Sequence, residues 1–124
     1  MSGNTRNRDL AFQAAEAALN HVSRNLTAGT NSQNIRALSF GSEAGLLNYV
    51  ATNANDAARW TAYSWDASNA RTVTVTVAQV ASQPMYVVEK MPTVGTAEYY
   101  RATARGVGKD STAVVILQAV YKIP

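Results

Sequence analysis

A helical pattern over residues 6–26, RNRDLAFQAAEAALNHVSRNL, limits the folds open to this chain more than any other feature. The stretch contains no Gly or Pro and is rich in Ala, Leu, Gln, Glu and Arg, which favour helices. At about 100° per residue, most of its apolar positions fall on one side of the helix. This stripe consists of Ala11, Phe12, Ala15, Ala18, Leu19, Val22 and Leu26. Because Gly29 suits the left-handed residue that ends a helix, we expect an amphipathic helix over about residues 5–27.

This helix is long compared with a domain of this size. At about 1.5 Å per residue it runs roughly 34 Å, whereas a domain of about 100 residues has a radius of gyration near 13 Å. We therefore expect the N-terminal end, about residues 6–12, to project with little cover from the domain. Thr5 is followed three residues later by Arg8 and not by the Glu or Gln of a capping box. We interpret the helix as the downstream half of a longer one, and residues 1–5 as a start codon and cloning residues.

The second half of the chain changes to a period of two. Val and Thr alternate after Arg71, which is typical of a half-buried strand. The pattern predicts strands over residues 71–80, 85–91, 98–105 and 113–123. Turns of about 3 to 6 residues join them, which is too short for parallel crossovers. Residues 57–65 fit one helical turn followed by a short strand, and the sequence does not decide between the two states.

These elements predict an α+β fold in two layers, with the long N-terminal helix packed on a roughly four-stranded antiparallel sheet. The 124 residues form a single domain. Within residues 1–124, the helix takes residues 6–27, a long irregular loop residues 28–70 and the sheet residues 71–123. Long loops of this kind are often functional surfaces.

Residue types needed for catalysis or metal binding are sparse. The chain has no Cys, which excludes disulfides and thiolate chemistry, and its eight carboxylates are scattered. His21 is the only histidine and is interpreted as a helix-surface residue without a second ligand. Gly106 and Gly108 fit a hairpin turn better than a nucleotide loop. No apolar run of about 18 residues is present. We expect no enzyme activity, no cofactor and no metal.

Two features of the predicted sheet bear on binding. Tyr99, Arg101, Thr103 and Arg105 share one strand face, on which the arginines and the aromatic ring could contact phosphates and bases. The net charge of +3 is mild, however, so an ordinary solvated face is the favoured interpretation. The last strand is apolar on both faces, which indicates a central strand, cover by the long loop, or an interface.

Two segments resemble a known family. RNRDLAFQAAEAALNHV at residues 6–22 and YYRATARGVGKDSTAVVILQAVYK at residues 99–122 are similar to PilX-type minor pilins of bacterial type IV pili. The resemblance implies a longer N-terminal helix whose first half lies in the inner membrane and later in the pilus core, after a leader peptide is cleaved. Neither the leader peptide nor the membrane half of the helix is in this sequence, so the chain looks like a soluble fragment. Glu16 is therefore not the glutamate found near the mature N-terminus of the family. Many pilins also carry a C-terminal disulfide, which this chain lacks.

The resemblance favours a non-enzymatic minor pilin that helps to initiate pilus assembly through contacts with other pilins. Its expected partners are other minor pilins and a pilus-tip adhesin, with the domain first in the periplasm and then on the surface pilus, where it would serve twitching motility and cell adhesion. The isolated fragment should be monomeric. The expected subunit interface comprises Arg6, Arg8, Asp9, Leu10 and Phe12. The alternative is an extracellular nucleic-acid or ligand-binding module that uses Tyr99, Arg101 and Arg105, although nucleic acid is not the favoured partner.

Overall fold

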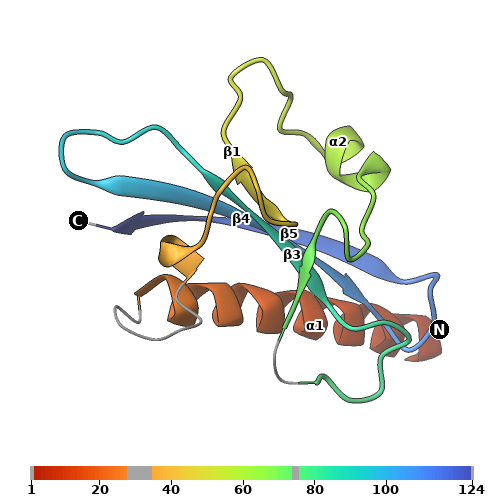
Figure 1. Cartoon of the computed structure of the whole chain (residues 1–124). Coiled ribbons are helices and arrows are strands. Elements are labelled where there is room, and N and C mark those ends of the chain that lie inside the picture. Colours follow the sequence, from red (N-terminus) through yellow and green to blue (C-terminus); the bar gives the residue numbers. More distant parts are fainter. Residues whose placement is uncertain (1, 28–34, 74–75, 124) are drawn as a thin grey trace.

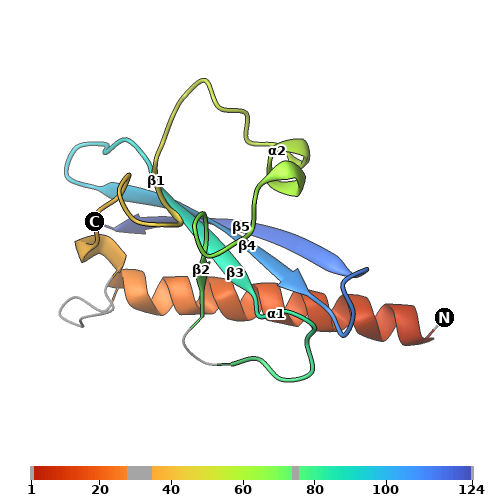
Figure 2. The same cartoon turned by 45° about the vertical axis from the view of Figure 1, so that its right-hand side comes forward.

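The chain folds as a sheet with one long helix on one face and a short helical segment on the other (Figures 1 and 2). The structure is a computed structural model that describes residues 2–27, 35–73 and 76–123. Gly29, expected to end the helix, and the turn residues 30–34 lie outside the described residues. The elements in chain order are α1 (Ser2–Thr27), η1 (Ile35–Ala37), β1 (Leu46–Asn48), α2 (Ala57–Ala62), β2 (Arg71–Thr72), β3 (Met85–Lys90), β4 (Glu98–Val107) and β5 (Val114–Ile123).

The sheet has five strands and is mixed, so the expected four-stranded antiparallel sheet is only partly right. β3, β4 and β5 form the predicted antiparallel meander, in the order β1-β3-β4-β5. β1 comes from the segment interpreted as loop and pairs in parallel with the second half of β3. β2 pairs antiparallel with the first two residues of β3, so two short strands share this edge.

The strand predicted over residues 71–80 is largely wrong, because only Arg71 and Thr72 join the sheet. Further along, the side chain of Gln83 hydrogen-bonds to both backbone groups of Val77. It accepts from Val77 N at 2.7 Å and donates to Val77 O at 2.9 Å. Gln79 then has a φ of 69°, which a strand does not permit. Residues 74–75 of this prediction lie outside the described residues.

Small residues form the seam between α1 and the sheet. Four alanines of α1 are fully buried: Ala11, Ala14, Ala15 and Ala18. Ala11 and Ala15 lie against Gly106 of β4, where a Cβ atom would be only 2.0 Å from the carbonyl oxygen of Ala11. Because the backbones approach this closely, a large side chain does not fit between them. Phe12, assigned to the buried stripe by periodicity, is therefore 44% exposed, and Ala14 faces the sheet instead.

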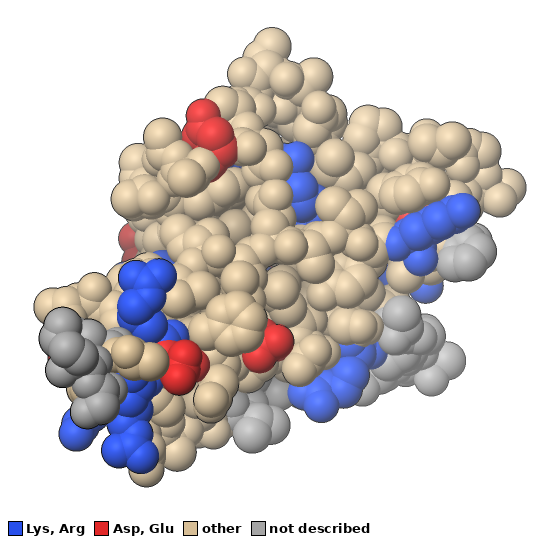
Figure 3. Space-filling model, turned by 180° about the vertical axis from the view of Figure 1, so that it is seen from behind, with Lys and Arg blue, Asp and Glu red and all other residues tan. Residues whose placement is uncertain are grey.

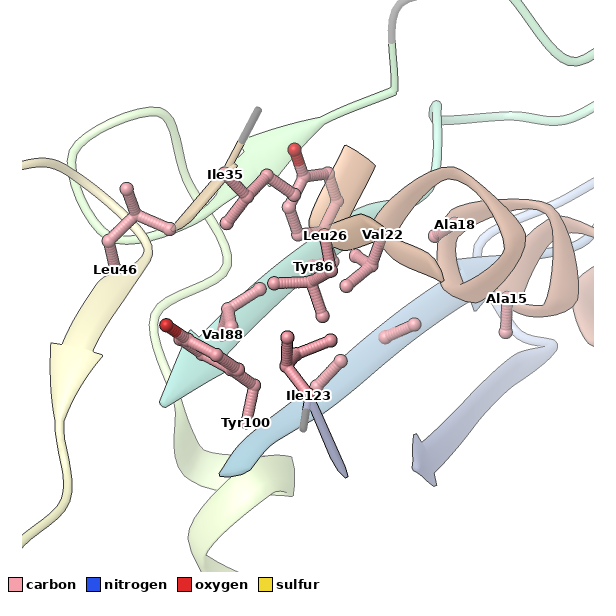
Figure 4. Close-up of a cluster of buried hydrophobic side chains, with 12 residues drawn as sticks. Ala15, Ala18, Val22, Leu26, Ile35, Leu46, Tyr86, Val88, Tyr100 and Ile123 are labelled. Atoms are coloured by element: carbon pink, nitrogen blue, oxygen red, sulfur yellow. The ribbon is translucent and has the colours of Figure 1, made fainter. Parts of the chain in front are cut away.

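Larger apolar side chains fill the other end of the seam, where α1 and the sheet diverge. Val22 and Leu26 of α1 meet Tyr86 and Val88 of β3 and Tyr100 of β4 in one buried cluster (Figure 4). Ile35, Leu46 and Ile123 close this cluster. The segment after α1 is thus anchored onto the core by its apolar residues.

The N-terminal end of α1 is covered on one side, although residues 6–12 were expected to project with little cover from the domain. Asn7 is buried at 8% exposure against the β4–β5 turn. Its Nδ2 donates to Asp110 Oδ1 at 3.0 Å, and its Oδ1 accepts from the Asp110 backbone N–H at 3.3 Å. Gly108 allows this contact, since a Cβ there would lie 2.3 Å from the Asn7 carbonyl oxygen. The two glycines interpreted as turn residues are therefore sites of close approach between the helix and the sheet.

The second face of the sheet carries the segment around α2, so the domain has three layers and not the expected two. Asp56 caps α2 by accepting from Arg59 N at 2.9 Å. Trp60 is buried with Ala70 and Val87, and Tyr63 and Trp65 pack against this cluster. The helical alternative for residues 57–65 is correct, and the described residues 63–65 form no strand.

Candidate functional site

The five residues expected at a subunit interface lie on two sides of the first turns of α1. Arg6, Asp9 and Leu10 line a shallow hollow of about 490 Å³, which Gln79 closes from the segment before β3. Arg8 and Phe12 are one helical turn apart and thus share another side. Arg6, Arg8, Asp9 and Phe12 are exposed, and Leu10 is half-buried. The covered side of the helix, with Asn7 and Ala11, separates these residues from the core.

The basic face predicted on β4 is mostly covered, which makes the solvated face a wrong expectation. Arg101 and Thr103 are buried, at 8% and 0% exposure. Tyr99 and Arg105 are half-buried, but six residues separate them, which is about 20 Å along a strand. The structure therefore does not bring these side chains together into one accessible surface. In the view of Figure 3, the Lys and Arg side chains form separate groups and no continuous patch.

Arg101 belongs to a buried ion cluster. Glu89 of β3, with 2% of its side chain exposed, accepts from Arg101 Nη2 at 2.8 Å and from Arg101 Nε at 2.9 Å. Its other oxygen lies 3.3 Å from Arg59 Nη1 of α2. Glu89 thus joins β4 and α2, and the pair satisfies a guanidinium that would otherwise be buried alone. Sequence reasoning missed this cluster because its three members are far apart along the chain.

A cavity of about 590 Å³ lies between the α2 segment and the outer face of β5. Its walls include Trp60, Trp65 and Arg105. Gln118 of β5 and Asn55 exchange two hydrogen bonds of 2.8 Å at its rim. The sequence signal for this part of the site is the cluster of aromatic residues in WTAYSW, within a segment that is otherwise polar.

β5 is an edge strand, so the interpretation as a central strand is wrong and the long loop covers it only in part. It pairs with β4 over all ten of its residues and with no other strand of the described chain. Ile116 packs against the cluster beneath α2, whereas Val114 and Val120 on the same face are 40% and 61% exposed. The strand therefore presents a long open edge with apolar side chains beside it.

His21 is buried at 6% exposure, so its interpretation as a helix-surface residue is wrong. Its ring lies against Tyr86, with the ring centroids 5.4 Å apart. Burial, and to a lesser degree the charges of Arg24 and Arg71, lower the pKa of His21 below 6.5. Near neutral pH the ring is therefore an uncharged part of the core.

The described residues contain no group of three or more His, Cys, Asp or Glu side chains placed to hold a metal ion. Among the same residues, no helix combines the length and the apolar character needed to cross a membrane.

A sequence model of the PilX family, described as type IV pilus assembly protein PilX C-term, matches residues 18–123. The chain belongs to this family. The match begins inside α1 and includes every strand. It contains the whole resembling segment at residues 99–122 and only residues 18–22 of the segment at residues 6–22. PilX proteins act in type IV pilus assembly and are a structural kind of protein. No curated protein and no solved structure matched the chain.

Proposed function

We propose that this PilX domain belongs to a minor pilin that helps to start pilus assembly by packing against other pilins. The domain faces the periplasm of the cell before it enters the pilus. Other minor pilins and a tip adhesin are its partners there. The family match is the observation that supports the role in assembly. The exposed end of α1 supports contact with other pilins through this helix.

The first turns of α1 have the properties of a docking surface on a rigid arm. The double hydrogen bond between Asn7 and Asp110 fixes this end of the helix to the sheet. On its free sides, Phe12 is 44% exposed and Leu10 half-buried. Arg8 and Asp9 form no ion pair with any described residue and are therefore available to charges on a neighbouring subunit. Each free side therefore offers one apolar side chain next to a charged one, and such a combination is found at protein interfaces.

Subunits that enter a pilus from one membrane share one orientation, so their α1 helices run in the same direction. This arrangement lets the first turns of α1 in one subunit meet the corresponding region of the next. The isolated domain has only a small part of the contact area and should remain monomeric, because a small interface does not offset the entropy lost on association.

The test is a double substitution, Leu10→Ser with Phe12→Ser, in the intact protein expressed in its own bacterium. Both side chains lie outside the buried cluster, so the isolated variant domain should unfold within a few degrees of the parent. Surface pili, counted by electron microscopy and measured in sheared fractions, should fall several-fold. The matched control is Glu16→Ser with Asn20→Ser, two exposed positions further along the same helix.

Two results would contradict the proposal at different levels. Normal piliation of the Leu10/Phe12 variant would show that this end of α1 is not the interface. Normal piliation after deletion of the whole gene would refute the role in assembly itself.

A further inference from the structure

The two edges of the sheet are unequal. The edge at β3 is occupied by the short strands β1 and β2, of three and two residues. The edge at β5 is ten residues long and has no strand beside it in the described chain. Folded proteins usually protect long edges with charges, proline, bulges or short strands. In β5, VVILQAVYKI, the only charge is Lys122, proline is absent, and the pairing with β4 runs without a bulge.

The hydrogen bonds of the β4–β5 hairpin identify the free backbone groups. Gly108 N donates to Ala113 O at 2.9 Å, which continues the β4–β5 register by one residue pair. In an antiparallel ladder, bonded and non-bonded pairs alternate, so the odd-numbered residues of β5 bond to β4. The N–H and C=O groups that point away from the sheet belong to Val114, Ile116, Gln118, Val120 and Lys122.

Exposed apolar side chains gather along this edge. Val114 and Val120 are 40% and 61% exposed on the outer face. On the inner face, the Tyr121 hydroxyl of β5 donates to the Leu19 carbonyl oxygen at 3.1 Å, which places that side of α1 next to β5. Phe12 lies two helical turns before Leu19 on the same side and is 44% exposed. The described chain has only five large apolar side chains this exposed, and three of them border β5.

We propose that the free edge of β5 is a docking site for an extended segment of another pilus protein, which adds to the sheet as a sixth strand. A row of unpaired N–H and C=O groups is complementary to another extended backbone, and this mode of binding is known as β-strand addition. The flanking side chains set the chemistry of the partner. Its segment should be β-forming and apolar on both faces, with one face over Val114 and Val120 and the other toward Phe12.

A second copy of this chain fits the free edge of β5 less well than a strand from another protein. The reason rests on the function proposed above. Asn7 lies beside Asp110 and Leu19 beside Tyr121, so α1 and β5 run in the same direction (Figure 2). Two copies joined by antiparallel β5 strands are related by a two-fold axis normal to the sheet, which reverses α1 in one copy. Subunits that share one orientation exclude this pairing, whereas a strand from a different protein does not.

The first test uses the isolated domain and the globular domains of the other minor pilins of the same bacterium, mixed with it one at a time. Amide hydrogen exchange of the free domain should alternate along β5, fast at residues 114, 116, 118, 120 and 122 and slow at the residues between them. In the mixture that forms a complex, the fast set should become protected.

Two substitutions at one exposed position separate the backbone from the side chain. Val120→Pro removes an outward N–H without removing a bond to β4, and should weaken binding of that domain at least tenfold. Val120→Thr keeps the N–H and the branched shape, and should bind within about twofold of the parent. The paired change Val114→Lys with Val120→Lys is a second block in case the proline variant unfolds, and it should weaken binding as strongly.

Four results would overturn the proposal. The first is an unchanged affinity of a folded Val120→Pro domain, and the second is protection that appears away from β5. The third is a concentration-dependent dimer of the isolated domain that protects the same amides. The fourth is the absence of a complex with any of the pilin domains. None of them bears on the assembly role, which gene deletion tests separately. Because Phe12 also borders this edge, the docking edge is tested by the Val120 variants and not by the Leu10/Phe12 variant. Loss of pili on deletion together with normal pili in the Val120→Pro strain would reject only the docking edge.

Discussion

Replacing Gly106 by alanine is the sharpest test of how α1 is held on the sheet. The added Cβ would lie 2.0 Å from Ala11 O, 2.5 Å from Ala15 N and 3.0 Å from Ala15 Cβ, whereas ordinary contacts of a Cβ begin at 3.4 Å. The nearest atoms belong to the helix backbone and cannot rotate away. The helix therefore has to retreat by 1.4 Å at this point (3.4 minus 2.0).

The retreat determines the expected loss of stability. A gap of about 0.5–1 Å already removes a quarter to a half of each dispersion contact, and the alanines of α1 pack at full burial here. Overpacked cores lose about 1–3 kcal/mol, and a rigid obstacle places Gly106→Ala near the upper limit. Relief of the backbone entropy of glycine returns about 0.4–1 kcal/mol. We expect a net loss of about 2–2.6 kcal/mol, which for a chain of this length is about 8–10 °C in Tm.

Thermal and urea unfolding of the isolated domain, followed by far-UV circular dichroism, measure this loss. Gly3→Ala is the matched control, because a Cβ at Gly3 has no atom within 4 Å and the residue lies in the same helix. It should leave Tm unchanged or raise it slightly, since alanine favours a helix by up to about 1 kcal/mol. A Gly106→Ala domain that loses less than about 0.5 kcal/mol would refute the argument that close approach at this glycine sets the position of the helix.

Three further predictions concern the buried groups. Glu89→Gln should lower the free energy of unfolding by about 3–5 kcal/mol in urea titrations, because Arg101 loses its charged partner. Glu89→Leu combined with Arg101→Met should recover most of this loss. A Glu89→Gln domain as stable as the parent would contradict the role of the cluster. The lowered pKa of His21 means that the unfolded chain binds more protons below pH 6.5, so stability should be full above that pH and fall as the pH decreases through it. His21→Phe should remove this dependence, and an equal pH slope in both proteins would rule out His21 as its source. Leu26→Ala should lower stability by about 2–5 kcal/mol, and Leu19→Ala by less because Leu19 is only partly buried. The reverse order in urea titrations would contradict this difference in burial between the two side chains.

The elements with a sustained period were predictable from the sequence. α1 and the three strands of the meander occur where the sequence placed them, and β3 and β4 are buried on both faces because α1 covers one face and the α2 segment the other. The alternation after Arg71 failed, since the Gln83 side chain satisfies the Val77 backbone and removes it from the ladder. β1 has only three residues and no period of its own, so its parallel pairing depends on a partner about 40 residues further along the chain.

The burial of individual side chains was harder to predict from the sequence than the elements themselves. Periodicity assigned Phe12 to the core because it is hydrophobic, whereas the close backbone approach at Gly106 selects alanine there. The burial of Arg101 follows from the α2 segment, which covers the outer face of the sheet and contributes Arg59 to the same carboxylate. Both outcomes depend on which distant segments meet, and a single sequence does not specify that.

The parallel pairing of β1 with β3 has a consequence for the order in which the chain folds. The β3–β4–β5 meander closes through short connections, whereas pairing β1 with β3 encloses the whole α2 segment in one long loop, and long loops lose more entropy on closure. We expect the meander to form early with α1 against it, and the α2 layer to dock last. The same layer should then be the first to open in the native state, so that a protease cuts within residues 50–57 while the α1 seam is still closed.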